Sequence, residues 1–181
     1  MKDLASHIMD IAQNSVRAKA SEIEIVIDEN LTEDRLSITI RDNGCGMDEE
    51  TLKRVRDPFF TSRTVRKVGL GIPLLQQNAE RTGGKVNITS EKGEGTVIEA
   101  IFGYTHLDRP PLGDVAGTIG LLVMANPETV FRYSHSSPKG EFHFDTEEVK
   151  AILEGLPINT PEIIRGIEEM IRENEKEIKE I

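Results

Sequence analysis

Residues 36–47 read LSITIRDNGCGM, an apolar strand that runs into a polar turn with two glycines. The apolar residues repeat at every second position, which predicts a strand with one buried face. Asp42 stands at the end of this strand, where a carboxylate can accept a hydrogen bond from an exocyclic amine such as that of adenine. Gly44 and Gly46 have no Cβ, so a flat ligand can approach the backbone. The alternative is a turn residue whose side chain bonds only its own backbone.

The segment before this strand predicts a helix over about residues 3–19 and a second strand at 23–27. The two strands form a hairpin with one buried face. On a helical wheel, four polar side chains form a stripe beside the apolar face of the helix: His7, Asp10, Asn14 and Arg17.

The segment after the strand begins with Asp48 as the N-cap of a short helix and continues into a basic stretch. Residues 53–67 hold six lysines and arginines but only one acidic residue, in a chain of net charge −10. Such a stretch is either a solvated face or an anion site. It ends in Gly69-Leu70-Gly71 at the start of a helix predicted over 72–81, and a helix N-terminus attracts phosphate.

A nucleotide accounts together for the polar stripe of the first helix, the glycine turn after Asp42 and the basic stretch that ends in Gly69-Leu70-Gly71. Arg63, Arg66 and Lys67 can neutralise a triphosphate, and Asn14 offers a neutral oxygen that suits Mg²⁺. The commoner phosphate motifs are absent from the sequence: there is no P-loop, and Gly69-x-Gly71 lacks the third glycine of a dinucleotide fingerprint.

Two more strands are predicted at 86–90 and 96–102, and the pattern breaks near a Pro-Pro pair at 110–111. The order helix, hairpin, helix, glycine-rich segment, helix, hairpin predicts an α+β fold, a two-layer α/β sandwich rather than a doubly wound sheet. We therefore expect a first domain at residues 1–106 and a small α+β module at 107–181.

The module at 107–181 is predicted to contain three helices, at residues 114–125, at 147–153 and from 160 onwards. Between the first two helices, strands at 129–134 and 141–145 form a hairpin. Its hairpin can pair either with an exposed sheet edge of the first domain or with another protomer. The isoleucine stripe of the last helix is either core or a dimer seam. We expect a role in partner binding or dimerisation. The scattered histidines His106, His135 and His143 lack metal-ligand spacing and are expected at the surface.

Composition excludes several classes of protein. The acidic net charge and the absence of Trp disfavour nucleic-acid binding. The longest uncharged stretch, residues 115–127, is too short to span a bilayer, so no membrane partner is expected. A single cysteine, Cys45, permits no internal disulfide and indicates the cytoplasm.

Five segments in order resemble the GHKL superfamily, whose Bergerat ATP-binding fold is shared by gyrase, heat-shock chaperones, histidine kinases and MutL-type repair proteins. IMDIAQNSVRAKASEIEI is similar to the N-box helix and strand, and RDNGCGM to the first glycine box. DPFFTSR, VGLGIPL and RTGGKVNITSEKGEGTVIEAIF resemble the F box, the second glycine box and the closing strands of histidine kinases. The resemblance covers about residues 3–102.

This resemblance implies roles for individual residues. Asn14 matches the Mg²⁺-binding asparagine, Asp42 the adenine-reading aspartate, and Thr96 a hydroxyl residue that joins the adenine contact. Asp10 stands where ATPases of the superfamily place a glutamate general base, and Asp is one methylene shorter. The expected ATP-binding residues are Asn14, Arg17, Asp42, Gly44, Gly46, Met47, Phe60, Arg63, Lys67, Gly69, Leu70, Gly71 and Thr96.

The resemblance implies a cytoplasmic, Mg-ATP-binding regulatory protein of signal transduction that acts on a protein partner, with a homodimer as an option. It is either a protein kinase, like histidine kinases or the serine kinases that act on anti-anti-sigma factors, or an ATPase. The alternative is a non-catalytic ATP-sensing switch that controls a protein–protein interaction. A MutL-like DNA-linked ATPase is a third reading, which the acidic charge disfavours. Because the asparagine is already residue 14, we expect a stand-alone catalytic-type domain. His7 is either a hydrogen-bonding neighbour of the site, a surface residue or a phosphoacceptor.

Overall fold

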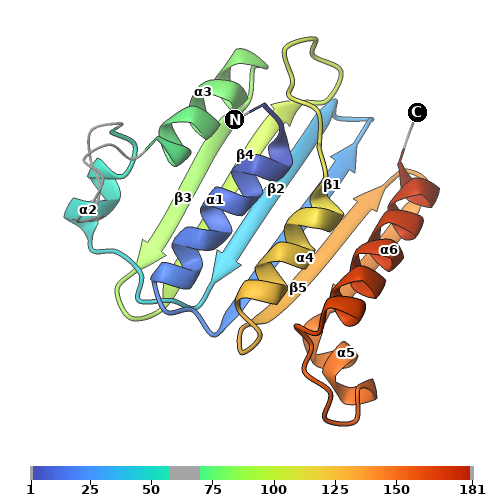
Figure 1. Cartoon of the computed structure of the whole chain (residues 1–181). Helices are drawn as coiled ribbons and strands as arrows, with labels where there is room; N and C mark the ends of the chain where they lie inside the picture. The colour runs from blue at the N-terminus through green and yellow to red at the C-terminus, as the bar shows by residue number, and fades with distance from the viewer. Residues whose placement is uncertain (1, 58–69, 180–181) are drawn as a thin grey trace.

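The computed structural model describes residues 2–57 and 70–179. This part of the chain forms a six-stranded sheet with helices packed against it (Figure 1). In chain order the elements are α1 (Leu4–Arg17), β1 (Glu22–Asn30), β2 (Arg35–Asp42), α2 (Glu49–Arg54), α3 (Gly71–Arg81), β3 (Lys85–Glu91), β4 (Gly95–Gly103), α4 (Val115–Ala125), β5 (Val130–Ser137), β6 (Gly140–Asp145), α5 (Thr146–Ile152) and α6 (Pro161–Ile178).

The strands lie in the order β3-β4-β2-β1-β5-β6. Neighbours are antiparallel except β1 and β5, which pair in parallel from Glu22 opposite Val130 to Asp28 opposite Ser136. The β5–β6 hairpin therefore extends the sheet at the edge of β1. This is the first of the two pairings expected for it, the one with an exposed sheet edge of the first domain. The prediction of an α+β two-layer sandwich is confirmed.

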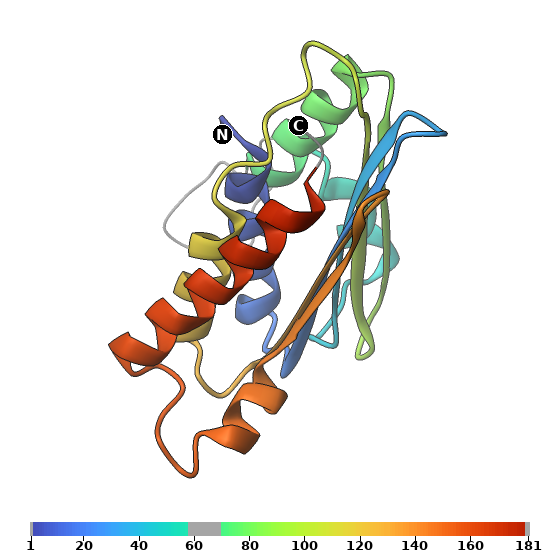
Figure 2. The same ribbon diagram turned by 90° about the vertical axis from the view of Figure 1, so that its right-hand side faces the viewer.

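One face of the sheet is buried because every second strand residue is apolar. Ile23, Ile25 and Ile27 of β1 point to this face and are at most 1% exposed. Helices α1, α3, α4 and α6 lie side by side over the same face (Figures 1 and 2). Removing each such isoleucine from water stabilises the fold by roughly 2 kcal/mol, so the alternation in sequence determines the side on which the helices pack.

Helix α6 covers the outer part of the sheet and packs against α4 (Figure 1). Its isoleucines at 164, 167, 171 and 178 are buried. The stripe on the last helix is therefore core, which was one of the two readings of that pattern.

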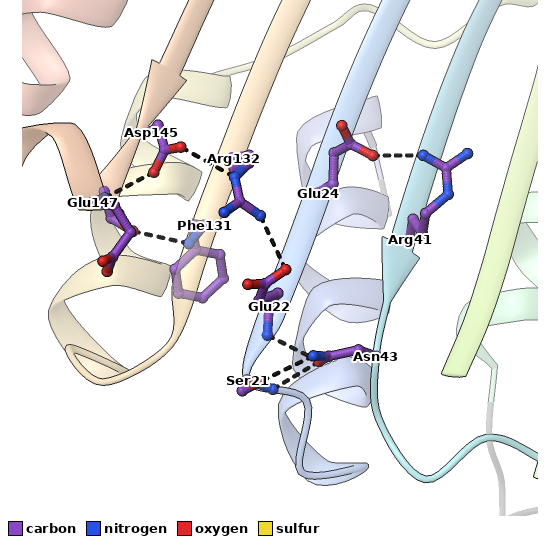
Figure 3. Close-up of polar contacts among 10 residues, drawn as sticks. Ser21, Glu22, Glu24, Arg41, Asn43, Phe131, Arg132, Asp145 and Glu147 are labelled. Atoms are coloured by element: carbon purple, nitrogen blue, oxygen red, sulfur yellow. Dashed lines mark hydrogen bonds and ion pairs between the residues drawn. The ribbon is translucent and has the colours of Figure 1, made fainter. Parts of the chain in front are cut away.

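Polar contacts on the opposite face join the first strands to the hairpin (Figure 3). Arg132 of β5 bonds Glu22 of β1 through Nη1 and Asp145 through Nε, each at 3.1 Å. Asn43 accepts hydrogen bonds from the backbone N–H groups of Ser21 and Glu22 at 2.9 and 3.0 Å, which fixes the turn after β2 against the start of β1. The Arg132 pairs are partly exposed, so each contributes little to stability and serves mainly to set register.

The expectation of surface histidines is wrong for His135. Its side chain is fully buried, whereas His106 and His143 are exposed. The cause is the strand period, since His135 follows the inward-facing residues Phe131 and Tyr133 at intervals of two.

Burial of His135 is compensated by three polar side chains from β1, β5 and α6: Glu29, Tyr133 and Glu175. These three residues and His135 are here called the His135 cluster. The His135 Nε2 atom lies 2.7 Å from Glu29 Oε1, and its Nδ1 atom lies 3.5 Å from Glu175 Oε1. The Tyr133 hydroxyl donates to Glu175 Oε1 at 2.5 Å. Lys179 pairs with the second oxygen of Glu175 at 3.2 Å. Such buried charges are tolerated only when they are paired in this way.

The cluster shifts the pKa of His135, Glu29 and Glu175 toward the charged form, whereas burial and the neighbouring Glu175 raise the pKa of the Tyr133 hydroxyl and keep it neutral. Burial alone would lower the pKa of His135, but hydrogen bonds and charge from Glu175 and Glu29 outweigh burial and raise it. Burial alone would raise the pKa of Glu29 and of Glu175, yet the hydrogen bond with His135 helps to lower both.

These shifts predict a pH-dependent contribution to stability. The imidazolium stabilises the fold fully below the ordinary histidine pKa of 6.5, and this contribution is lost as pH rises through the raised pKa. The carboxylates contribute above their ordinary pKa of 4.5 and lose that contribution as pH falls through the lowered value. We expect His135→Gln to lower the free energy of unfolding by ~3 kcal/mol near pH ~5.5 and by less at pH ~9. Urea unfolding across pH measures this.

His143→Gln is the matched control, because His143 is exposed. It should change the free energy of unfolding by less than ~0.5 kcal/mol. An equal loss for His135→Gln at every pH would contradict the charge-based account.

Candidate functional site

Asp42 ends β2 directly opposite Thr96 of β4, so strand pairing alone brings these two predicted adenine contacts together. The Asp42 carboxylate accepts three hydrogen bonds. They come from the Ser15 hydroxyl at 2.5 Å, the Gly44 N–H at 2.9 Å and the Thr96 N–H at 3.3 Å. Donors from three separate segments thus hold the half-buried carboxylate in one orientation.

Ser15 is the residue of this group that sequence reasoning missed. It lies on the buried face of α1 together with Ile11 and Ala12. The signal was a hydroxyl residue at a buried helical position directly after Asn14. Its hydroxyl also lies 3.4 Å from the Ile11 carbonyl, a common arrangement for serine within a helix.

The glycine turn after Asp42 is packed too closely for other residues. A Cβ at Gly44 would lie 2.8 Å from Ala18 Cβ. Gly46 has φ +66°, and a Cβ there would overlap the Glu91 carbonyl. Cys45 between them is exposed, and its N–H donates to the Ala18 carbonyl at 2.8 Å. The turn therefore holds the end of α1 against the sheet.

A hydroxyl of β3 connects the glycine turn to β4. Ser90 Oγ accepts from the Met47 N–H at 2.8 Å and lies 2.8 Å from Thr96 Oγ1. Met47 and Thr96 are both partly exposed, as is Asp42.

Asn14 and Arg17 lie one turn apart on α1 and are bonded to each other. The Arg17 guanidinium donates to Asn14 Oδ1, the oxygen expected to bind Mg²⁺. A metal bound there would have to displace this contact. In residues 2–57 and 70–179, no group of three or more His, Cys, Asp or Glu side chains is arranged to hold a metal.

Helix α3 begins at Gly71, with the half-exposed Leu70 as its N-cap. No described side chain caps its first amides, which leaves them suited to an anion. A Cβ at Gly71 would overlap the Asp10 carboxylate, so Asp10 lies directly against this helix end. The structure thus brings Asp10, Leu70 and Gly71 together, one turn of α1 away from Asn14.

The remaining predicted ligands, Phe60, Arg63, Arg66, Lys67 and Gly69, lie outside the described residues. No helix of the described part is long and apolar enough to cross a bilayer.

Residues 2–106 match the family described as histidine kinase-, DNA gyrase B- and HSP90-like ATPases. The match covers more than half of the chain and includes every site residue described above.

The chain belongs to this GHKL ATPase family.

Among GHKL relatives, a protein of Shewanella frigidimarina described as a sensor protein is 36% identical over 103 residues, which are 56% of this chain and 16% of that protein. Sporulation kinase E of Bacillus subtilis is 39% identical over 68 residues, 38% of this chain and 9% of the kinase. The chain therefore spans less than one-fifth of the length of these relatives. The N-terminal domain of a DNA repair protein shares the fold, with a TM-score of 0.54 and 16% identity over 79% of this chain and 52% of that structure.

The contacts of Asp42 predict the effect of removing its charge. Asp42→Asn should weaken ATP binding ~10-fold or more, because a hydrogen bond to a charged group is worth ~1.5–3 kcal/mol. Isothermal titration calorimetry with ATP measures the change. Asp48→Asn is the control, since Asp48 is an exposed cap of α2 and should leave the affinity unchanged. Equal affinities for Asp42→Asn and the native protein would remove the adenine assignment.

Proposed function

We propose that this GHKL protein binds Mg-ATP and transfers the γ-phosphoryl group to a partner protein or to water, as a regulator in the cytoplasm. One observation carries the proposal: the Asp10 carboxylate lies against Gly71 at the N-terminus of α3, which no side chain of the described residues caps, with Asn14 one turn further along α1. A proton acceptor, a phosphate-binding helix end and a metal-binding oxygen are thus adjacent.

The adenine would bind at the other end of the site, beside Asp42 and Thr96. The free capacity of the Asp42 oxygens suits the exocyclic amine, and Thr96 lies opposite on the paired strand with its N–H bonded to the Asp42 carboxylate. Gly44 and Gly46 allow the base to approach the backbone.

Asn14 Oδ1 fits Mg²⁺, which prefers oxygen ligands and keeps several waters and phosphate oxygens around a single protein ligand. When bound, the ion would neutralise charge on the phosphates. Arg17 would then release Asn14 and be available for a phosphate oxygen.

In the proposed reaction Asp10 accepts the proton of the attacking hydroxyl or water. The new bond forms between that oxygen and the γ-phosphorus, the bond from the γ-phosphorus to the bridging oxygen breaks, and ADP leaves. The N–H groups at the start of α3 stabilise the charge on the transferred group.

A groove of about 490 Å³ between α1 and α4 gives an acceptor a path to Asp10. Asp10 lines this groove together with Met9 and Gln13 of α1 and Thr118 and Leu121 of α4. It therefore borders both the start of α3 and an open cleft. This arrangement favours transfer to a protein side chain over a closed hydrolytic site.

We also propose that residues 107–181 form a partner or dimer element beside a GHKL domain at 1–106. Leu121 and Met124 support this, because they are 56% and 41% exposed on the outward side of α4. The second candidate function is an ATP-sensing switch, which the Asn14–Arg17 contact favours because nucleotide and metal would have to rearrange it.

Incubation of the full chain with Mg²⁺ and γ-labelled ATP tests the proposal. Asp10→Asn should lower release or transfer of label by at least ~100-fold, the usual contribution of a general base. ATP affinity, measured in parallel by calorimetry, should stay within ~3-fold of that of the native protein, because the proposed role of Asp10 is at the γ-phosphate and not at the adenine ring.

Asp48→Asn serves as the control for an aspartate outside the site. Free phosphate would indicate an ATPase, and label on a protein would indicate a kinase. Label that stays in bound ATP with every partner tested would favour the switch. Failure of the native protein to bind ATP would overturn the proposal.

A further inference from the structure

His7 joins α1 to α3 from within the core. Its side chain is 2% exposed, and its Nε2 atom lies 2.8 Å from the Asn78 amide nitrogen. In the part of the chain that the structure describes, α1 and α3 are in direct contact, and this hydrogen bond lies between them.

The bond lies on the helix faces that form the candidate site. His7 precedes Asp10 by three residues and Asn14 by seven, spacings that place all three on one face of α1. Asn78 follows Gly71 by seven residues, two turns along the same face of α3. Beside the apolar packing, two polar points therefore join the helices: His7 against Asn78, and Asp10 against Gly71.

Packing alone does not account for a histidine at this position. His7 borders a small cavity of about 10 Å³ whose other lining residues are apolar, including Ile8, Ile11 and Leu75. Its Nδ1 atom is buried without a hydrogen-bond partner among the described residues. Burial lowers the pKa of His7 to about 4, with a smaller contribution from the charge of the chain's N-terminus. The ring is therefore neutral at pH 7. A leucine would fill the space without an unsatisfied polar atom.

We propose that His7 is a positioning residue, which holds the N-terminus of α3 at its working distance from Asp10 and Asn14 through the bond to Asn78. The inference rests on the proposed function, because it concerns where the phosphate-binding amides lie. Those amides act over hydrogen-bond distances, so a small displacement of α3 reduces phosphate contacts. The proposed adenine contacts at Asp42 and Thr96 lie on paired strands, and the α1 residue that bonds Asp42 is Ser15, eight residues along the helix from His7.

The test compares ATP with adenosine, which shares the base but has no phosphates. His7→Leu should weaken ATP binding ~10-fold, because misplacement by ~1 Å can cost up to ~100-fold in a positioned site. Adenosine affinity should change by less than ~2-fold. Calorimetry with each ligand gives both values. Asn78→Leu should give the same pattern, and the double variant should bind ATP no more weakly than either single variant, because both remove one bond.

His7→Gln keeps a hydrogen-bonding group that can reach Asn78, and it should recover ATP affinity to within ~3-fold of the native protein. His143→Leu is the control for loss of an exposed histidine. If His7→Leu does not fold, Asn78→Leu carries the test, because Asn78 is only half-buried.

Equal losses for ATP and adenosine, additive losses in the double variant, or unchanged ATP affinity would each overturn the inference. Failure of the native protein to bind ATP would instead overturn the proposed function, so the two failures are distinguishable.

Discussion

Burial of one face of β1 is the constraint on which the rest of the structure depends. Ile23, Ile25 and Ile27 lie under the helices, and both neighbours of β1 must present apolar residues to the same face. The same period then directs Glu29 inward, where a carboxylate needs a partner. His135 supplies it from the neighbouring strand, and α6 adds the second carboxylate of the His135 cluster. A buried charge is thus a direct result of the strand alternation that builds the core.

The candidate site uses the edges of this core rather than its centre. Strand pairing fixes Asp42 beside Thr96, and contact between α1 and α3 fixes Asp10 beside Gly71. The first pair belongs to the sheet and the second to the helix layer. A nucleotide that spans both would sense any change in the distance between the layers, which gives the fold a physical means of coupling ligand binding to the arrangement of its helices.

Much of this could be predicted from sequence, because it follows from local periodicity. Alternation in 36–40 and helical spacing in 3–19 gave the buried faces, and the glycines marked the turn after Asp42. What could not be predicted depends on which strands become neighbours. The burial of His135 requires that β5 pair with β1, and the role of Ser15 requires that α1 lie over the end of β2. Neither arrangement can be recognised from the pattern of a few consecutive residues, because each joins segments that are far apart in the sequence.

The glycine turn also has a practical chemical consequence. Cys45 is the single thiol of the chain, it is exposed, and it stands between two glycines that border the candidate adenine region. Its backbone is fixed by bonds to Ala18 and Gly93, so a probe attached to the sulfur would have a defined origin. A thiol-reactive fluorophore would label this one position of the native protein and report spectroscopically on events at the turn, with no need to engineer a cysteine or remove another.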